Sequence, residues 1–285
     1  MFTAIQLGPY TAKVRMQAFA LGVAELGGRV VNLPAPTLSQ LAASQDLKQA
    51  QFAFTSGMHD NEALGRGWLA GLGKPLLVLD CGWFRRAAGP NDQVGYNQLG
   101  LNKLAWVPTE DCPPERFASL GVKLEPAVQD RPKVALVLGQ VPGDSQHHLN
   151  AVSLSAWLSE RAAGWLARGW KVVYRPHPKA PTLPMPVRSL AINPVSESPA
   201  ASFARAAVVV TYNSTAGLEA LLAGMPVDCH PSAHYAGLHP GTPELLAHCR
   251  RLAWTQWTCD ELRSGEPLRW MNRFAPLLQA AEAAA

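Results

Sequence analysis

The sequence lacks paired cysteines. Its five cysteines are odd in number and none stands in CxxC spacing, so neither a zinc site nor a disulfide framework is expected. A reducing cytoplasm is the simplest compartment for such a chain. The chain also lacks any apolar run close to the roughly 20 residues that span a bilayer. Met1–Ile5 shows neither the basic region nor the cleavage site of a signal peptide. A soluble, cytoplasmic protein is therefore expected.

A strong charge of one sign is also missing. The 25 Lys and Arg residues exceed the 21 Asp and Glu residues by only four, well short of the density of an obligate nucleic-acid binder. The surplus lies wholly in the second half: residues 1–130 carry 11 charges of each sign, and residues 131–285 carry 14 positive against 10 negative. This bias suits a half that binds an anion such as a nucleotide phosphate, although a chance distribution of solvated charges explains it equally well.

Apolar residues make up 48% of the 285 positions, enough to bury a sizeable core. At about 150 residues per domain the length fits two domains, and residues 125–132 (EPAVQDRP) read as a linker. We therefore expect an N-terminal domain over residues 1–125 and a C-terminal domain over residues 133–285.

Short apolar runs alternate with amphipathic stretches in both halves, which is typical of βαβ units on a parallel sheet. In the first half the expected strands are Phe2–Leu7, Arg29–Leu33, Gln51–Thr55 and Pro75–Leu79, and the expected helices are Thr11–Leu26, Leu38–Ala43 and Asn61–Leu72. In the second half the expected strands are Val134–Leu138, Trp170–Tyr174, Arg188–Ile192, Ala207–Thr211 and Pro226–Cys229, and the expected helices are Val152–Ala167, Ala200–Ala206 and Ser214–Ala223, with a mostly helical remainder from Thr242. The predicted fold class is α/β, with two Rossmann-like, doubly wound domains facing across a cleft. In such domains ligands bind at the carboxyl ends of the strands.

The segment after the strand at 207–211 has the features of an anion site. Asn213, Ser214 or Thr215 can cap the following helix, whose unpaired N–H groups attract a phosphate. Gly217 allows close approach, and Glu219 is placed to accept hydrogen bonds from a ribose. A plain capped helix packed on the sheet is an equally good interpretation of this segment.

Two further loops follow strands of the same half. Arg175 and His177 flank a proline and Pro178 follows them, so both side chains are presented from a stiff loop, which suits binding of a nucleotide phosphate. Such a histidine is more often a surface or capping residue when it stands alone. Asp144 lies in a Gly/Pro turn after a strand and is a candidate general base for an acceptor hydroxyl. Its alternative role is that of an Asx-turn residue.

Four motifs occur in order: GQVPGDSQ, RPHP, YNSTAGLEALLAGMPV and HYAG. Together they resemble the capsular polysaccharide biosynthesis glycosyltransferases, bacterial enzymes similar to the Kdo transferases of group 2 capsule assembly. The resemblance covers roughly Val134–Gly237. It implies a GT-B-like fold, a nucleotide-sugar donor in the C-terminal domain, and inverting transfer without a metal or other cofactor.

The resemblance also implies roles for individual residues. His177 and Pro178 match the His-Pro box that holds the donor phosphate, and Ser214 with Thr215 matches the hydroxyl pair that does the same. Gln140, together with Asp144, matches the Gln/Asp motif that lines the active cleft.

The first half lacks an acidic motif that matches the family's catalytic region. Asp80, Asp60 and His59 are therefore rivals to Asp144 as the base, each with a turn or capping role as its alternative. Trp83, with Phe84 and Tyr96, is a candidate stacking platform for a sugar or a base. Trp157, Trp165 and Trp170, and likewise Trp254 and Trp257, are expected to pack in cores.

The sequence thus predicts a metal-independent glycosyltransferase that moves a sugar from a nucleotide-sugar donor to a glycan or glycolipid acceptor. His230, His234 and His239 lack a metal-binding spacing and an acidic partner, so no metal is expected. Three alternatives stay open. One is a phage-type transferase acting on a hydroxylated DNA base, with Arg85 and Arg86 tracking the strand. The others are a non-catalytic nucleotide-sugar-binding module and a nucleotide-sugar epimerase.

Overall fold

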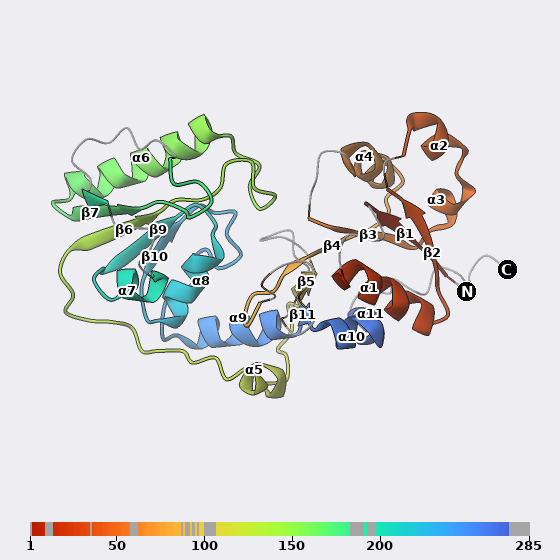
Figure 1. The fold of residues 1–285 in the computed structure, drawn as a ribbon. Helices are drawn as coiled ribbons and strands as arrows, with labels where there is room; N and C mark the ends of the chain where they lie inside the picture. The colour runs from red at the N-terminus through yellow and green to blue at the C-terminus, as the bar shows by residue number, and fades with distance from the viewer. Residues whose placement is uncertain are drawn as a thin grey trace. The chain divides into compact units, whose positions relative to one another are not determined.

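The computed structural model describes residues 2–8, 14–34, 36–57, 62–86, 88, 92, 95, 97–99, 107–182, 191–192 and 198–273. The chain forms two compact units. Unit 1 comprises Met1–Leu120 and Arg251–Ala285, and unit 2 comprises Gly121–Arg250. Each unit is a sheet with helices on both faces (Figure 1), so the predicted α/β fold class with two Rossmann-like units is confirmed.

The sheet of unit 1 has a parallel part and a short antiparallel edge. Strands β1 (Thr3–Leu7), β2 (Arg29–Leu33), β3 (Phe52–Ser56) and β4 (Leu76–Cys81) are parallel and lie in the order β4-β3-β1-β2. Strands β5 (Asn97–Leu99) and β11 (Gln256–Trp257) extend the β4 edge with antiparallel pairing. The strand order of the parallel part therefore reverses between β1 and β3.

Helices cover both faces of this sheet. On one face α1 (Val14–Glu25) packs through Phe19, whose ring centroid lies 4.8 Å from that of Phe54, and the same core includes residues of α10 (Cys259–Arg263) and α11 (Glu266–Met271). On the other face α2 (Leu38–Ala43), α3 (Gln45–Gln49) and α4 (Ala63–Gly71) enclose a second apolar core. Two of these helices, α2 and α3, are capped at their N-termini. The side chains of Thr37 and Ser44 accept hydrogen bonds from backbone N–H groups of the first turns.

The C-terminal segment belongs to unit 1. Strand β11 pairs with β5, and α10 packs closely on α1. A side chain at Gly22 of α1 would place its Cβ 2.0 Å from the carbonyl oxygen of Leu262, so this helix contact requires glycine. The prediction of one domain over residues 133–285 is therefore wrong for residues 251–273. Their apolar pattern identifies them as helical, but it does not specify the sheet against which they pack.

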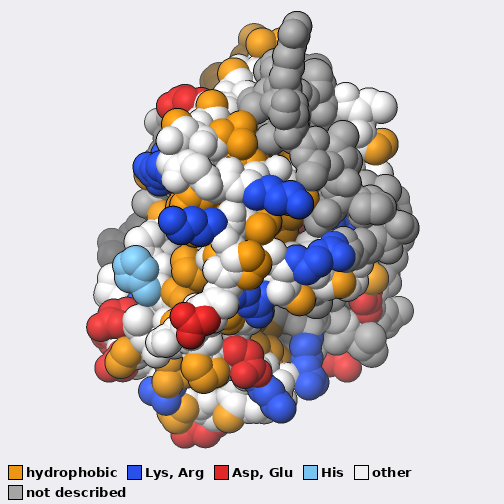
Figure 2. Space-filling model, turned by 90° about the vertical axis from the view of Figure 1, so that its left-hand side faces the viewer, with side chains coloured by type: hydrophobic (Ala, Val, Ile, Leu, Met, Phe, Trp, Pro, Cys, Tyr) orange, Lys and Arg blue, Asp and Glu red, His pale blue; other side chains and the backbone are white. Residues whose placement is uncertain are grey.

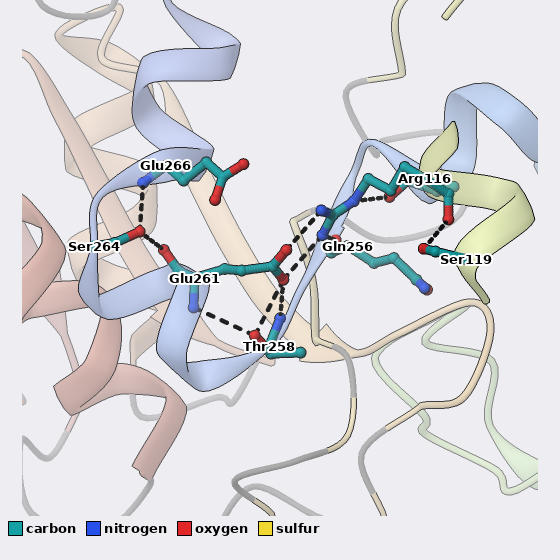
Figure 3. Close-up of polar contacts among 8 residues, drawn as sticks. Arg116, Ser119, Gln256, Thr258, Glu261, Ser264 and Glu266 are labelled. Atoms are coloured by element: carbon teal, nitrogen blue, oxygen red, sulfur yellow. Dashed lines mark hydrogen bonds and ion pairs between the residues drawn. The ribbon is translucent and has the colours of Figure 1, made fainter. Parts of the chain in front are cut away.

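Arg116 of α5 (Glu115–Ser119) anchors this returning segment (Figure 3). Its guanidinium donates to both carboxylate oxygens of Glu261, at 2.6 and 2.9 Å, and to the carbonyl oxygens of Gln256 and Ala253, at 2.6 and 2.7 Å. It also lies 4.2 Å from the centroid of the Trp257 ring. Burial alone raises the pKa of Glu261, but the hydrogen bonds from Arg116 and Thr258 outweigh it and lower that pKa.

Unit 2 contains a fully parallel sheet. Strands β6 (Val134–Leu138), β7 (Lys171–Arg175), β8 (Ala191–Ile192), β9 (Val208–Thr211) and β10 (Val227–Cys229) lie in the order β10-β9-β6-β7-β8. Numbered within the unit this order is 5-4-1-2-3, the doubly wound order. It reverses between β6 and β9.

The helices of unit 2 also cover both faces of its sheet. Helix α6 (Ala151–Ala167) packs on one face, while α7 (Pro199–Phe203) and α8 (Thr215–Leu222) contribute to the core on the other. Helix α9 (Pro243–Ala253) leads out of the unit. The predicted packing of the tryptophans is confirmed. Trp157, Trp165 and Trp170 pack against the α6 core, and the rings of Trp254 and Trp257 are in contact in unit 1.

No helix in the described part of the chain has both the length and the apolar character required to cross a membrane. On the face of the molecule shown in Figure 2, Lys and Arg side chains are interspersed with Asp and Glu side chains and with hydrophobic ones.

Candidate functional site

The loops that follow β6 and β9 of unit 2 meet at the point where the strand order reverses. These strands are hydrogen-bonded neighbours, with Val137 opposite Val210. In doubly wound sheets a crevice forms at this point, outside the carboxyl ends of the strands, because the chain leaves the two neighbouring strands toward opposite faces. The candidate site is built on these loops.

Gln140, after β6, and Asn213, after β9, are joined side by side. The Gln140 Oε1 atom accepts hydrogen bonds from the Asn213 backbone N–H at 3.0 Å and from the Thr211 hydroxyl at 3.3 Å. Its Nε2 atom donates to the Asn213 Oδ1 atom at 3.1 Å. Both side chains are buried. Because their polar atoms are bonded within the protein, the two residues fix the loops rather than present free groups to a donor.

Asn213 also connects these loops to two other segments. Its Nδ2 group donates to the carbonyl oxygen of Gln146 at 2.8 Å and contacts the Ser232 hydroxyl at 3.4 Å. One amide thus holds together the loops after β6, β9 and β10.

The start of α8 is held from two sides. The Ser214 hydroxyl caps the helix by accepting from the Ala216 N–H at 3.3 Å. The Tyr235 hydroxyl donates to the Ser214 carbonyl oxygen at 2.6 Å, and its buried ring leaves no room for a side chain at Gly217, whose Cβ would lie 2.2 Å from the Tyr235 Oη atom. Ser214 and Thr215 are half-buried at this helix start, and so is Glu219 one turn further on.

Tyr235 is a site residue to which the sequence analysis assigned no role. The signal was present, because Tyr235 lies in the HYAG motif. Its contact with Ser214, 21 positions earlier in the chain, follows from the tertiary structure alone.

Arg175 and His177 lie beside the same loops. Arg175 ends β7 opposite Leu138, its side chain is buried, and its carbonyl oxygen accepts from the Gly139 N–H at 2.9 Å. The half-buried His177 ring accepts the Lys179 N–H on Nδ1 at 3.1 Å. In the neutral ring the proton then resides on Nε2, which is a hydrogen-bond donor. Pro178 is exposed.

Gly139 makes the close approach of the β6 and β7 loops possible. A Cβ at this position would lie 2.6 Å from the Tyr174 Oη atom and 3.0 Å from the His177 backbone nitrogen. Because Gly139 has no side chain, the loop that carries His177 can lie next to the loop that carries Gln140.

Asp144 is part of a turn. One of its carboxylate oxygens accepts the Gln146 N–H at 2.8 Å, which is the Asx-turn geometry that the sequence suggested as the alternative role. The side chain is half-buried, and the turn keeps the carboxylate within the segment that Asn213 connects to the β9 loop.

The histidines do not gather as metal ligands. His230 stacks on Tyr212, with ring centroids 4.2 Å apart, and His234 contacts His248 through ring nitrogens at 3.0 Å. His239 is exposed. In the described ranges no three His, Cys, Asp or Glu side chains are close enough to share a metal ion.

The site residues that the sequence predicted in unit 1 lie in different surroundings. The Asp80 carboxylate lies at the end of β4, accepts the Cys81 N–H at 2.7 Å and is 3.8 Å from the Arg15 guanidinium. Trp83 is 5% exposed and its indole N–H donates to the Thr255 hydroxyl, so the predicted stacking platform is wrong for Trp83 and also for the buried Phe84. Burial of these rings against the returning C-terminal segment is the physical reason. His59, Asp60 and Tyr96 lie outside the described residues.

An apolar cavity of about 550 Å³ also lies along α4. Its lining consists of one side of that helix and includes no charged residue among the described ones: Ala63, Leu64, Gly67, Trp68, Gly71 and Leu72. None of the candidate residues that the structure describes belongs to this lining.

One stretch of the chain contains the loop after β9, the Ser214 cap of α8, α8 itself and Tyr235. Residues 195–242 match the family described as "Capsule polysaccharide biosynthesis protein". The predicted resemblance to capsular polysaccharide biosynthesis glycosyltransferases is confirmed. The matched stretch includes the Asn213–Ser214–Thr215 loop and the HYAG motif but not the His177 loop or Asp144.

Two solved structures share the fold of the whole chain. "Thermosulfurimonas dismutans KpsC, beta Kdo 2,4 transferase" has a TM-score of 0.59 at 15% identity, over 90% of this chain and 92% of that one. "Thermosulfurimonas dismutans KpsC, beta Kdo 2,7 transferase" has a TM-score of 0.51 at 15% identity, over 94% and 99%. At this identity the likeness is one of fold, and it agrees with the predicted GT-B-like architecture. A search of curated proteins finds no match.

Proposed function

We propose that this protein is a glycosyltransferase that transfers a sugar from a nucleotide-sugar donor to an acceptor hydroxyl. The observation that carries the proposal is the Gln140–Asn213 contact, which joins two loops at the reversal point of the unit 2 sheet. Ligands of doubly wound sheets bind at this point. The stretch that matches the capsule family includes the β9 side of this contact.

The donor phosphate is proposed to bind between the start of α8 and the His177 loop. The Ser214 and Thr215 hydroxyls and the positive end of the α8 dipole attract phosphate oxygens. The His177 Nε2–H group donates a hydrogen bond, and Arg175 contributes positive charge. These groups stabilise the negative charge that develops on the leaving phosphate during transfer.

Asp144 is proposed as the catalytic base, with Asp80 as the rival carboxylate. The acceptor oxygen attacks the anomeric carbon while the bond from that carbon to the phosphate oxygen breaks, and the acceptor proton passes to the carboxylate. The nucleotide leaves with the bonding electron pair. A single displacement of this kind inverts the anomeric centre, and the proposal assigns no step to a metal ion.

A Kdo-type sugar is the first donor to test, because the two structures with the same fold are named as Kdo transferases. A capsule-type glycan or glycolipid is the corresponding acceptor. Neither the family description nor the names of the two structures refer to a DNA acceptor.

A thermal-shift screen of the full chain with CMP-, UDP-, GDP- and TDP-sugars, a Kdo-carrying nucleotide among them, tests donor binding. A ligand that binds only the folded protein raises Tm in proportion to RT ln(1 + [L]/Kd). We expect one nucleotide-sugar to raise Tm, the His177→Ala variant to lose most of this shift, and the control variant His239→Ala to keep it. A full shift in His177→Ala would show that the donor assignment is wrong.

The role of Asp144 is tested by turnover. We expect Asp144→Asn to lower kcat by about 10²–10⁴-fold while the donor-induced Tm shift is retained, and the sugar in the product to have the inverted configuration. A sugar adduct on Asp144, detected by intact mass, would instead identify a nucleophile and retaining transfer. Donor binding without turnover in the wild-type protein would favour the non-catalytic module.

A further inference from the structure

Helix α9 carries a histidine on the face that packs into the core. Buried residues recur along this helix at positions i, i+3, i+4 and i+7, the spacing of one helix face: Leu245, His248, Cys249 and Leu252. His248 is 8% exposed. A polar ring at a core position costs stability unless it is hydrogen-bonded, so the partner of His248 indicates what this residue does.

The partner of His248 is His234 of the HYAG motif. The His248 Nε2 atom lies 3.0 Å from the His234 Nδ1 atom, and the two rings stack with centroids 5.3 Å apart. Burial of its ring, and secondarily His248, lowers the pKa of His234 well below the ordinary 6.5, so His234 is neutral at neutral pH. Between two neutral rings one facing nitrogen donates and the other accepts. This bond attaches the HYAG motif to α9.

His234 in turn contacts Tyr235, the residue that fixes the start of α8. The two rings meet edge to face, with centroids 4.9 Å apart and an angle of 85° between the planes. The Tyr235 hydroxyl donates to the Ser214 carbonyl oxygen at 2.6 Å, and its ring fills the space in which a side chain at Gly217 would lie. Three successive contacts therefore connect α9 to the start of α8.

We propose that His248 is a positioning residue for the donor phosphate site and acts through His234 and Tyr235 on the start of α8. The proposal rests on the proposed function, in which this helix start binds the donor phosphate. Hydrogen bonds to a phosphate weaken when their donors are displaced, so the site depends on how firmly the Ser214 hydroxyl and the N–H groups of the first turn are held. His248 contributes to that rigidity without contacting the donor.

Two substitutions at position 248 separate the hydrogen bond from the packing. His248→Leu keeps an apolar side chain in the core and removes the bond to His234. His248→Gln keeps this bond, because an amide can both donate and accept. Leu252→Val is the matched control. Leu252 is fully buried on the same face of α9, and its truncation lowers Tm through packing while both imidazoles stay in place.

The first measurement is hydrogen exchange of the full chain without ligand. The reporters are two backbone N–H groups at the start of α8: that of Gly217 donates to the Ser214 carbonyl oxygen at 2.8 Å, and that of Ala216 donates to the Ser214 hydroxyl at 3.3 Å. We expect peptides over residues 213–219 to exchange about five-fold faster in His248→Leu, the change that loss of one hydrogen bond produces.

The other two variants make this measurement decisive. We expect exchange in His248→Gln and Leu252→Val to stay within about two-fold of the wild-type rate, because the bond between α9 and the HYAG motif is kept. Unchanged exchange in His248→Leu, or equally fast exchange in His248→Gln, would overturn the proposal.

The second measurement is the Kd of CMP, UDP, GDP and TDP, determined by titration calorimetry. Each of these nucleotides carries the phosphate that leaves with it in the proposed reaction. For the nucleotide that binds the wild-type protein most tightly, we expect His248→Leu to raise Kd about 3–10-fold, and His248→Gln and Leu252→Val to change it less than about two-fold. A purely structural role would lower Tm and leave the Kd of the folded molecules unchanged, so an unchanged Kd in His248→Leu would also overturn the proposal.

Failure of the proposed function is seen separately. If none of the four nucleotides binds the wild-type protein, the proposed donor site is wrong and the donor role of His248 falls with it, while the exchange measurement still decides whether α9 fixes the start of α8. If a nucleotide binds the wild-type and His248→Leu proteins equally, the donor site stands and only the positioning role is wrong.

Discussion

The hydroxyl of Tyr235 donates a hydrogen bond to the backbone carbonyl oxygen of Ser214 at 2.6 Å. Burial, and to a lesser degree Cys229, raises the pKa of Tyr235 well above its ordinary value, so the hydroxyl keeps its proton and remains a donor. This single bond connects the HYAG motif to the cap of α8. The position of the proposed phosphate site therefore depends on a residue that lies outside the loop forming that site.

Replacement of Tyr235 by Phe removes this bond and keeps the ring. We expect a fall in Tm of about 1–6 °C and a smaller Tm shift with the nucleotide-sugar, because the start of α8 is no longer fixed. Tyr174→Phe is the matched control: Tyr174 is also buried, but its hydroxyl has no partner among the described residues. Its Tm should stay level or rise, and equal losses in both variants would contradict the assigned role of Tyr235.

Gly217→Ala tests the packing of the same tyrosine. The new methyl group would lie 2.2 Å from the Tyr235 Oη atom, so the tyrosine or the helix must move, and we expect a loss of about 1–3 kcal/mol. Gly164→Ala, in the exposed middle of α6 with no atom within 4 Å of the added methyl group, should gain about 1 kcal/mol from helix propensity. Denaturant unfolding measures the change in the free energy of unfolding for each variant. We expect the two changes to have opposite signs.

The stability of unit 2 should depend on pH through His234. Burial, and secondarily the neighbouring His248, lowers the pKa of His234 well below its ordinary 6.5. The unfolded chain therefore takes up a proton that the folded chain does not, and stability falls as the pH drops through and below 6.5. We expect Tm to fall between pH 7 and pH 5.

The His234→Gln variant removes this titrating group, so its Tm should change less over the same range. The exposed His239 supplies the control, because the Tm of the His239→Gln variant should change with pH as much as that of the wild-type protein does. A wild-type Tm that is constant from pH 7 to pH 5 would refute the assignment.

Arg116→Lys should loosen the returning C-terminal segment. Lysine keeps the charge but loses the fork that contacts Glu261 and two carbonyl oxygens, and we expect a loss of about 2–3 kcal/mol, less than for a fully buried pair because Glu261 is partly exposed. Arg263→Lys, at the exposed pair with Asp260, should change stability by less than about 0.5 kcal/mol. Hydrogen exchange in residues 256–271 reports the loosening, and equal exchange in the two variants would contradict it.

The elements of the parallel sheets were well determined by the sequence. The strands at Arg29–Leu33 and Val134–Leu138 and the helix at Leu38–Ala43 have the predicted bounds, because a short apolar run between turn residues and an amphipathic run after a cap are local signals. The pairing of β5 with β11 was missed. Strands of two or three residues carry no period, and their partner lies more than 150 positions away.

Trp83 shows the limit of an interpretation based on residue type. An aromatic side chain in an irregular segment suits a platform as well as a core, and only its contacts with Thr255 and Gln256 of the returning segment decide for the core.

By itself the sequence determined which loops carry hydroxyl, imidazole and carboxylate groups, since each of these loops follows an apolar strand whose pattern is local. Only the tertiary structure decided that Gln140 and Asn213 are bonded to each other and that Tyr235 holds Ser214. These facts depend on strand order and side-chain packing, which join residues far apart in the chain and leave no periodic trace in it.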